Sequence, residues 1–593
     1  MADARVLETS YWPAEPGDVH DTTVCETLRH AAATVPERLA LVDCVPDAGA
    51  RETWTYAELL ADAERVARAL LATFAPGERI AVWAPNSARW IVLQHGVALA
   101  GMVLVALNPA YRAREVSFVL RQSGAAGLFC PAEHRGFAMR GMLDDIRPET
   151  PELRKIVTFE DWDEFLAGGD PGRELPAVAP EDVIQIQYTS GTTGFPKGAM
   201  LHHKGLVNEA RHVAERAGMG DGGVYVNAMP MYHIGGGAVT SFGAWAKRGT
   251  FVILPGFDPG LLLEAVETYR GTHTLVVPTM LIAVLDHPDR ARRDLTSMQT
   301  VLSGAASVPA SLVHKTQRLL GCQFTILFGQ TETHGVISQT RVTDSPEDQA
   351  ETVGQPLPRL EVKIADQVTG EPVAPGETGE ICCRGYQNML GYFRMEAETA
   401  ATIDAEGWLH MGDLGSMDER GFIRIRGRSK DMIIRGGLNI YPAEIEAALG
   451  DHPAIEYAAV IGVPDAKWGE QIGAVVTLRA GAGRPSLEEL TTYLRSQLAP
   501  HKTPVYWAFV DEMPATPSGK IQKFVLHKRF EEGTLRFDAV RASSTEPAST
   551  RNRPGGTRTM TSSIPRADEG FDFSGSGVLI AGGTSGVGLA TAV

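Results

Sequence analysis

The chain has 593 residues, and its 72 acidic side chains outnumber its 55 Lys and Arg residues, for a net charge of −17 at pH 7. This acidic balance disfavours nucleic acids and anionic membrane surfaces as bulk partners. The N-terminus lacks the cationic start and apolar core of a signal peptide, and no apolar run approaches the ~18 residues of a membrane span. Six cysteines are scattered without a CxxC pair. We therefore expect a cytoplasmic protein with reduced, mostly buried thiols and no transmembrane segment.

The first part of the chain alternates between helical and strand patterns. Residues 56–73 place apolar side chains on one helical stripe, and a second helix is expected from a cap at Ser87 through Ala100, with Gly101 at its C-terminal end. Short apolar strands are predicted at 80–83, 102–107, 274–278 and 300–306. This alternation favours an α/β layer structure with largely parallel sheets.

A glycine-rich loop follows a predicted strand at 183–187 and reads YTSGTTGFPKGAM from Tyr188 to Met200. Glycine lets a backbone approach a bulky anion, while N–H groups and hydroxyls donate hydrogen bonds to phosphate oxygens. It is not a Walker P-loop, because Pro196 precedes Lys197 and Gly198 follows it. Taken alone, the loop is either a phosphate-binding loop or a flexible polar hairpin.

From about Gly354 the pattern changes to short strands separated by Gly and Pro, which indicates a compact β subdomain. Cys382 and Cys383 are neighbours in one of these strands, so they should point to opposite faces and pack in the core. Beyond Lys430 a smaller α+β unit is expected. Its predicted elements cover 458–463, 474–478, 487–498 and 506–510.

The end of the chain has a different composition. Residues 541–568 are rich in Ser, Thr, Pro, Arg and Gly, which predicts a disordered linker. A strand at 578–581 then runs into glycines, as at the start of a dinucleotide-binding turn, although a glycine-rich tail is the alternative. This stretch resembles the opening of a short-chain dehydrogenase/reductase, with Ala581 where Thr is usual. Only five residues follow Gly588, so we expect no dinucleotide binding here and a reductase domain in a longer natural protein.

Four further stretches carry groups that a nucleotide-activating site needs. Residues 328–335 (FGQTETHG) offer a ring, a hydroxyl and a carboxylate suited to Mg²⁺. Residues 407–415 contain an aspartate that can accept hydrogen bonds from ribose, and residues 421–446 contain several cations beside a glycine pair. Residues 514–523 place a lysine on a turn where it can reach developing negative charge. As isolated residues, each has an ordinary surface interpretation.

In this order and spacing, the stretches resemble the adenylate-forming enzymes, which include acyl-CoA synthetases, luciferases and the adenylation domains of peptide synthetases. The resemblance covers about residues 20–530, and GRSKDMIIRGGLNIYPAEIE with SGKIQK is most similar to synthetases for medium-chain or aryl acids. It implies an α/β adenylate-forming fold. A large N-terminal domain of layered α/β sheets with a small β subdomain would precede a small mobile α+β C-terminal domain. The expected boundaries are 1–429, 430–537, a disordered linker at 538–573 and a truncated Rossmann-type reductase start at 574–593.

The resemblance also implies a role for each matching residue. The phosphates would be held by Thr189, Ser190, Gly191, Thr192, Thr193, Gly194 and Lys197. The adenine would lie against Gly304, Ala305, Ala306, Phe328 and Gly329, with Phe328 in place of a usual Tyr. The remaining contacts would be Thr331 with the α-phosphate, Glu332 with Mg²⁺, Asp413 and Arg428 with ribose, and Lys520 with carboxylate and α-phosphate. Lys430 would be the hinge, and Gly436 and Gly437 would face CoA. The acyl pocket would include Tyr232, His233 near the carboxylate, and His334, although a packed or solvated His334 is the alternative.

The activity implied by the resemblance is ATP- and Mg²⁺-dependent activation of a carboxylic acid as an acyl-adenylate, followed by thioester formation with CoA. No acid stands where amino-acid-activating members place an Asp, which disfavours an amino acid substrate. One alternative keeps adenylation but uses an amine, a carrier-protein thiol, or a small oxyanion such as nitrite. Another is a nucleotide-binding scaffold without catalysis, against which Lys197, Glu332 and Lys520 together argue.

Overall fold

The computed structural model describes residues 6–189, 196–306, 308–435, 438–465, 468–515 and 521–539. Several predicted features lie outside the described residues: Ser190, Gly191, Thr192, Thr193, Gly194, Gly436, Gly437, Lys520, the linker beyond residue 539 and the reductase-like tail. In the part of the chain that is described, no helix is long and apolar enough to cross a membrane.

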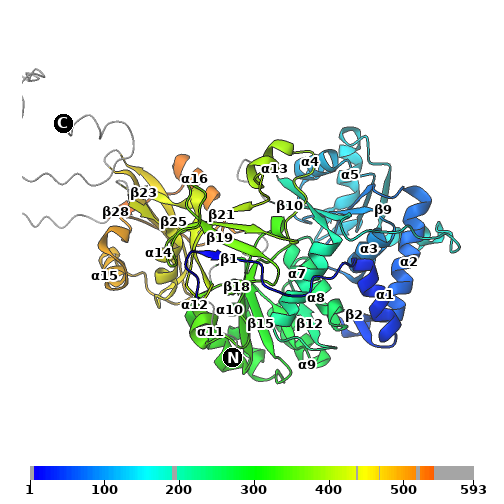
Figure 1. Cartoon of the computed structure of the whole chain (residues 1–593), viewed down its shortest axis with the longest axis horizontal. Helices are drawn as coiled ribbons and strands as arrows, with labels where there is room; N and C mark the ends of the chain where they lie inside the picture. Colours follow the sequence, from blue (N-terminus) through cyan, green and yellow to red (C-terminus); the bar gives the residue numbers. More distant parts are fainter. Residues whose placement is uncertain are drawn as a thin grey trace, which may run out of the picture. The chain divides into compact units, whose positions relative to one another are not determined.

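A mainly parallel sheet of six described strands forms the first α/β layer (Figure 1). Its order is β11 (Lys197–His202), β10 (Val183–Thr189), β5 (Val103–Leu107), β4 (Arg79–Trp83), β6 (Gly127–Cys130) and β9 (Lys155–Thr158). The two predicted helices are α2 (Tyr56–Thr73) and α3 (Ala88–Leu99). Ser87 caps α3 by accepting a hydrogen bond from the Trp90 N–H at 3.3 Å, as the sequence predicted.

The second sheet has nine strands among the described residues. Its order is β18 (Gln355–Pro356), β17 (Ser338–Gln339), β16 (Gln323–Phe328), β15 (Thr300–Gly304), β14 (His273–Leu275), β12 (Val224–Asn227), β13 (Thr250–Ile253), β2 (Leu39–Asp43) and β3 (Glu52–Thr55). The strands from β16 to β2 are parallel, whereas both ends of the sheet are antiparallel. The strand predicted at 274–278 ends at Leu275, because Pro278 opens α10 (Pro278–Asp286), where a missing N–H costs nothing.

Further helices accompany these two sheets in the described residues. They are α1 (Val24–Thr34), α4 (Ala113–Ser123), α5 (Met139–Ile146), α6 (Trp162–Ala167), α7 (His203–Arg216), α8 (Ser241–Ala246), α9 (Pro259–Tyr269), α11 (Ala310–Leu320), α12 (Pro346–Glu351) and α13 (Glu396–Thr402). A short hairpin of β7 (Glu133–His134) and β8 (Phe137–Ala138) lies apart from both sheets.

The predicted β subdomain is an antiparallel sheet. It consists of β1 (Tyr11–Trp12), β19 (Glu361–Ala365), β20 (Gly379–Arg384), β21 (Leu409–Met417) and β22 (Ile423–Arg428). The edge strand β1 comes from the N-terminal segment, where Tyr11 pairs with Lys363. Cys382 and Cys383 pack into different hydrophobic clusters, which confirms that they face opposite sides of β20. All six cysteines are free and buried.

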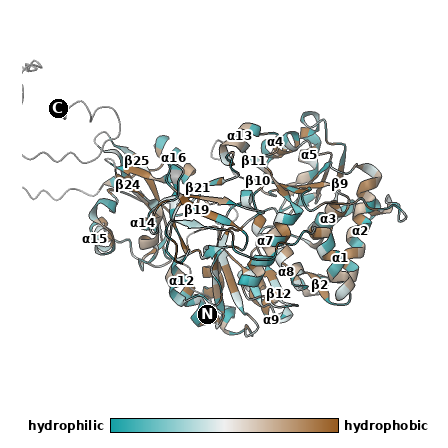
Figure 2. Cartoon of the chain, viewed as in Figure 1, coloured by the Kyte–Doolittle hydropathy of each residue, from teal (hydrophilic) through white to brown (hydrophobic). Residues whose placement is uncertain are grey.

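The C-terminal α+β unit is also present. Its strands are β23 (Ile433–Arg435), β24 (Leu438–Ile440), β25 (Ile455–Asp465), β26 (Gly469–Leu478), β27 (Tyr506–Phe509) and β28 (Asp538–Ala539), with α14 (Pro442–Gly450), α15 (Leu487–Gln497) and α16 (Lys523–Glu531). Strand β25 is largely hydrophobic in Figure 2 and pairs along its length with β26. At the start of the predicted linker, Asp538 and Ala539 form β28 against β27. The predicted domain boundaries themselves stay predictions.

Candidate functional site

The glycine-rich loop connects the two strands of a hairpin. Strands β10 and β11 pair in antiparallel register, and the pair nearest the loop is Thr189 with Lys197. Both residues were predicted to contact phosphate, and the hairpin holds them opposite each other. The predicted strand therefore leads into the loop, and the pairing of Thr189 with Lys197 fixes where the loop begins and ends.

Four side chains meet beside this hairpin. Glu332 Oε1 accepts hydrogen bonds from Tyr392 Oη at 2.8 Å and from Thr189 Oγ1 at 3.4 Å. Lys197 Nζ lies 4.8 Å from the centroid of the Tyr392 ring, within the range of a cation–π contact. Glu332 is 9% exposed and Tyr392 6% exposed. The carboxylate and hydroxyl oxygens form the hard donor set that Mg²⁺ prefers, and the lysine supplies a cation for phosphate, so these residues fit a magnesium–polyphosphate ligand.

Tyr392 is the residue of this group that sequence analysis missed. It lies in segment 389–393, whose backbone runs beside β11, with hydrogen bonds from Phe393 N to Gly198 O at 2.8 Å and from Leu390 N to Met200 O at 3.0 Å. Burial, and then the negative charge of Glu332, raise the pKa of the Tyr392 phenol. The phenol therefore stays protonated and donates to Glu332. A tyrosine after a glycine is too common a pattern to be singled out in a sequence.

The residues predicted to frame adenine lie at the carboxyl ends of two neighbouring parallel strands, β15 and β16. Gly304 pairs with Leu327, and a Cβ atom on Gly304 would lie only 2.4 Å from the Leu327 carbonyl oxygen. Ala305 has φ +63°, a left-handed conformation in which the chain turns away after β15. Ala305 and Ala306 are exposed, and Phe328 is half-buried at the end of β16. Small side chains beside an aromatic ring fit a flat base.

Gly329 and Thr331 continue this edge into the short helix η6 (Thr331–Thr333). A Cβ on Gly329 would lie 2.3 Å from the Gly335 carbonyl oxygen, so the chain passes closely over itself just before Glu332. Thr331 is half-buried at the first position of η6. This compact turn sets the direction of the Glu332 side chain.

The predicted ribose contacts, Asp413 and Arg428, are paired residues on β21 and β22. Arg428 Nε donates to Asp413 Oδ1 at 3.1 Å, and Asp413 is 7% exposed. Lys430, the predicted hinge, follows in the short helix η7 (Ser429–Asp431). Partial burial, together with the positive charge of Arg428, lowers the pKa of Lys430.

The predicted acyl-pocket segment is held by buried amides. Asn86 Nδ2 donates to Met229 O at 3.0 Å, and Asn86 Oδ1 accepts from Met231 N at 2.8 Å. Immediately after this turn, Gln187 Nε2 donates to Tyr232 O at 2.7 Å, which ties the segment to β10. His233 Nδ1 accepts from Gly235 N at 3.2 Å. The segment that carries Tyr232 and His233 is therefore fixed to the same strand that leads into the phosphate loop.

His334 occupies the packed position that was the alternative to a place in the acyl pocket. Its side chain is fully buried, Nε2 accepts from His202 N at 3.0 Å, and Nδ1 lies 2.7 Å from Gln387 O. Because Nε2 accepts, Nδ1 carries the proton and donates to that carbonyl. Gly205 leaves room for the ring, since a Cβ there would lie 2.5 Å from it. Both polar atoms are used by the backbone, so we do not assign His334 to substrate binding.

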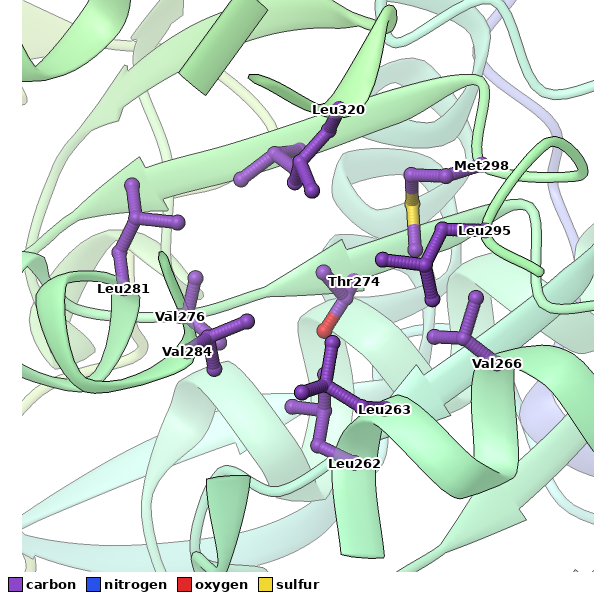
Figure 3. A pocket seen from close by; sticks show the side chains of 11 residues that line it. Leu262, Leu263, Val266, Thr274, Val276, Leu281, Val284, Leu295, Met298 and Leu320 are labelled. Atoms are coloured by element: carbon purple, nitrogen blue, oxygen red, sulfur yellow. The ribbon is translucent and has the colours of Figure 1, made fainter. Parts of the chain in front are cut away.

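A separate apolar cavity of about 20 Å³ lies between α9, β14, β15, α10 and α11 (Figure 3). Thr274 provides the oxygen seen among the lining side chains, and its hydroxyl already donates to Val226 O at 2.9 Å. The space holds about one water molecule, far less than an acyl chain requires. We interpret it as a packing void rather than a substrate pocket.

Comparisons with known proteins agree with this arrangement of residues. The family model "AMP-binding enzyme" matches residues 28–393, and "AMP-binding enzyme C-terminal domain" matches residues 444–520. The putative acyl-CoA synthetase YngI of Bacillus subtilis is 36% identical over 537 residues, which covers 86% of this chain and 97% of that protein. The mitochondrial medium-chain acyl-CoA ligase ACSF2 of Danio rerio is 35% identical over 550 residues, covering 87% and 89%.

A solved structure shows the same fold. The o-succinylbenzoate CoA synthetase MenE from Bacillus subtilis, in complex with the acyl-adenylate intermediate OSB-AMP, aligns with a TM-score of 0.75 and 29% identity. The alignment covers 86% of this chain and 98% of MenE. The expected adenylate-forming fold is thereby confirmed, and the chain belongs to the AMP-binding enzyme family, among its acyl-CoA synthetases.

Proposed function

We propose that this protein is an ATP-dependent acid:CoA ligase that acts on a medium-chain or aryl carboxylic acid. The observation that carries the proposal is the meeting of Thr189, Lys197 and Glu332 beside the glycine-rich hairpin, in a chain of the acyl-CoA synthetase family. The acid class is supported by the similarity to ACSF2, a medium-chain acyl-CoA ligase, and to MenE, an o-succinylbenzoate CoA synthetase. The cytoplasmic location and the downstream reductase domain remain predictions from the sequence.

The chemistry consists of two displacements. In the first, a carboxylate oxygen attacks the α-phosphorus of ATP, an O–P bond forms, and pyrophosphate leaves. In the second, the thiol sulfur of CoA attacks the acyl carbon, its proton passes to solvent, and AMP leaves. When bound at Glu332, Mg²⁺ would neutralise part of the phosphate charge.

The described side chains contribute by position and charge. Lys197 offsets negative charge on the phosphates, and the Tyr392 hydrogen bond holds Glu332 in one orientation. In this proposal the hydrogen-bonded pair of Asp413 and Arg428 fixes the ribose, which limits the rotation of the α-phosphate relative to the acid. The buried Gln187 contact keeps the His233 segment beside β10, where we place the acid.

The test is AMP release from ATP and Mg²⁺ over a panel of aliphatic and aryl acids, each assayed with and without CoA, with mass spectrometry of the products. We expect turnover that requires CoA and yields an acyl-CoA from a medium-chain or aryl acid. Adenylation that CoA does not accelerate would contradict the ligase assignment and would direct the search to amines, carrier thiols and small oxyanions.

Lys520 provides a second test, because it is expected to act only in the first step. Lys520→Ala should abolish most AMP formation from ATP and acid, while chemically prepared acyl-adenylate is still converted to acyl-CoA. The neighbouring exposed Lys528 gives a matched control, Lys528→Ala, with activity unchanged. Adenylation by Lys520→Ala at the wild-type rate would show that the assigned role is wrong.

A further inference from the structure

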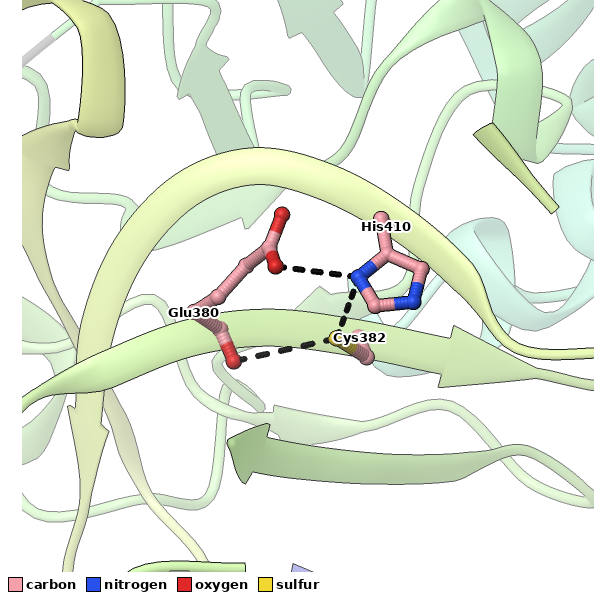
Figure 4. A group of neighbouring side chains, drawn as sticks. All are labelled: Glu380, Cys382 and His410. Atoms are coloured by element: carbon pink, nitrogen blue, oxygen red, sulfur yellow. Dashed lines mark hydrogen bonds and ion pairs between the residues drawn. The ribbon is translucent and has the colours of Figure 1, made fainter. Parts of the chain in front are cut away.

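Three side chains of metal-binding types lie together on the β subdomain, apart from the residues assigned to ATP, acid and CoA (Figure 4). They are Glu380 and Cys382 on β20 and His410 on β21. His410 Nδ1 lies 2.9 Å from Glu380 Oε2 and 3.5 Å from Cys382 Sγ. All three donor atoms lie within 4.8 Å of one another.

The strand register explains why these residues meet. Glu380 and Cys382 are two residues apart in β20, so their side chains leave the same face of the sheet. Cys382 pairs directly with His410, which places the imidazole on that face. Glu380 pairs with Leu414, so the register shifts between the two pairs and β21 carries additional residues after His410. This bulge brings the ring against both residues of β20.

We propose that Glu380, Cys382 and His410 bind one Zn²⁺ ion. A sulfur, a nitrogen and a carboxylate oxygen are the donors zinc takes, and tetrahedral zinc holds sulfur and nitrogen about 3.6 Å apart and nitrogen and oxygen about 3.3 Å apart. The sulfur–nitrogen separation already matches, and the Glu380 oxygen, which is about 0.4 Å too close to the nitrogen, has to move away from it. On binding, the thiol proton passes to solvent and the thiolate becomes the ligand.

The surroundings suit a zinc site with a fourth position for solvent. The Cys382 side chain is buried, while the side chains of His410 and Glu380 are 34% and 20% exposed, so an ion can enter from the surface. Asp404 Oδ2 lies 3.6 Å from His410 Nε2, so its negative charge favours a proton on Nε2 and leaves Nδ1 for the metal. Glu380 Oε1 also accepts a hydrogen bond from Gly412 N at 3.2 Å.

The hydrogen bond from Gly412 N to Glu380 Oε1 predicts what zinc does to the protein. Gly412 has φ +69° and immediately precedes Asp413, the expected ribose contact. An ion on Oε2 of Glu380 fixes the carboxylate whose other oxygen holds this part of β21. We therefore assign the ion a structural role, in which it stabilises the bulge of the β subdomain.

The experiment measures metal in the full chain. After chelator treatment, the protein is dialysed against Zn²⁺ with excess Mg²⁺ to occupy other carboxylate sites, and zinc is quantified per chain. We expect one zinc per chain, a melting temperature raised by several degrees, and, with Co²⁺ instead of Zn²⁺, a thiolate-to-metal charge-transfer band. Cys382→Ser and Glu380→Gln should lose the zinc and the band, and in Glu380→Gln the amide oxygen can still accept the hydrogen bond from Gly412 N.

Cys383→Ser is the matched control, because Cys383 is a buried neighbour that faces the other side of β20. It should keep both the zinc and the cobalt band. Wild-type protein without bound zinc would overturn the proposal, and the cluster would then be a hydrogen-bonded network of His410 with two carboxylates. Zinc retained by Cys382→Ser at the wild-type level would also overturn it, since the ion would then lie elsewhere.

Discussion

Tyr392 contacts two residues that we expect to face the phosphates of ATP. Its hydroxyl donates to Glu332, and its ring lies under the Lys197 ammonium. Removing only the hydroxyl leaves the ring and separates these two contributions. A hydrogen bond to a charged group contributes about 1.5–3 kcal/mol, equivalent to roughly a 10- to 100-fold change in rate.

Tyr392→Phe should therefore lower kcat/KM for AMP formation by about 10- to 100-fold and raise the Mg²⁺ concentration needed for half-maximal activity. Tyr392→Leu, which also removes the ring from Lys197, should lose more and raise the KM for ATP. The measurement is initial-rate kinetics over a Mg²⁺ titration at fixed ATP.

The control for this series is Tyr386→Phe. The Tyr386 hydroxyl is buried and has no hydrogen-bond partner among the described residues, so its removal should change neither kcat/KM nor the Mg²⁺ requirement. If Tyr392→Phe behaved like this control, the Tyr392 hydroxyl would have no part in positioning Glu332.

At the scale of elements, the site depends on how closely β15 and β16 approach at their carboxyl ends. Gly304→Ala places a Cβ 2.4 Å from the Leu327 carbonyl, and a backbone atom cannot rotate away. The strands must separate, which should reduce the free energy of unfolding by about 1–3 kcal/mol. Phe328, the predicted adenine contact, ends β16, so the KM for ATP should also rise several-fold.

Gly256→Ala is the control, because a Cβ on Gly256 would meet nothing within 4 Å. Both variants are measured by the same urea unfolding and ATP kinetics. Equal stability and KM in the two variants would show that this approach is not needed.

The hairpin strand β10 shows how an element's pattern can be interpreted only in part. The alternation VIQIQ predicts a strand with one apolar face buried, and β10 confirms the strand. Both faces are buried, however, since Gln185 and Gln187 are 0% and 1% exposed. Their side-chain amides form a chain of hydrogen bonds with Gln94. Gln94 Nε2 donates to Gln185 Oε1 at 3.3 Å, and Gln185 Nε2 donates to Gln187 Oε1 at 3.0 Å. The periodicity indicates a polar face but not its partners.

At the scale of the whole molecule, buried titratable groups set the pH dependence of stability. His95 is 1% exposed, its ring nitrogens have no partner among the described residues, and burial lowers its pKa to about 3. In the unfolded chain its pKa is ~6.5, so below that pH the unfolded state binds a proton that the folded state does not. Stability from this group is therefore lost as the pH falls from ~6.5 toward 3. Glu209 has the opposite sign, because burial raises its pKa and the folded state retains a proton as the pH rises.

His95→Met should keep wild-type stability at pH 7.5, because it removes polar atoms that have no partner. Between pH 7.5 and 5.5 the variant should lose about 1.4 kcal/mol less than the wild type, measured by urea unfolding. Glu209→Gln should lose more stability than the wild type between pH 7.5 and 5.5, because it lacks the carboxyl group whose raised pKa favours the folded state as the pH falls. An identical pH slope in wild type and His95→Met would show that His95 is not held neutral in the folded state.

Local patterns in the sequence determined the elements that depend on neighbours in the chain. The cap at Ser87, the helix at 56–73 and the parallel α/β layers follow from short-range spacing and are present as predicted. The order of the motifs was sufficient to identify the family, because each motif carries its own chemistry. Only the tertiary structure decided which distant residues complete the site. Glu332 meets a tyrosine 60 positions away, Tyr11 joins a sheet 350 positions away, and His334 packs against the backbone of His202 and Gln387. Such contacts depend on how the sheets pack, and the periodicity of a segment contains no information about the segment packed against it.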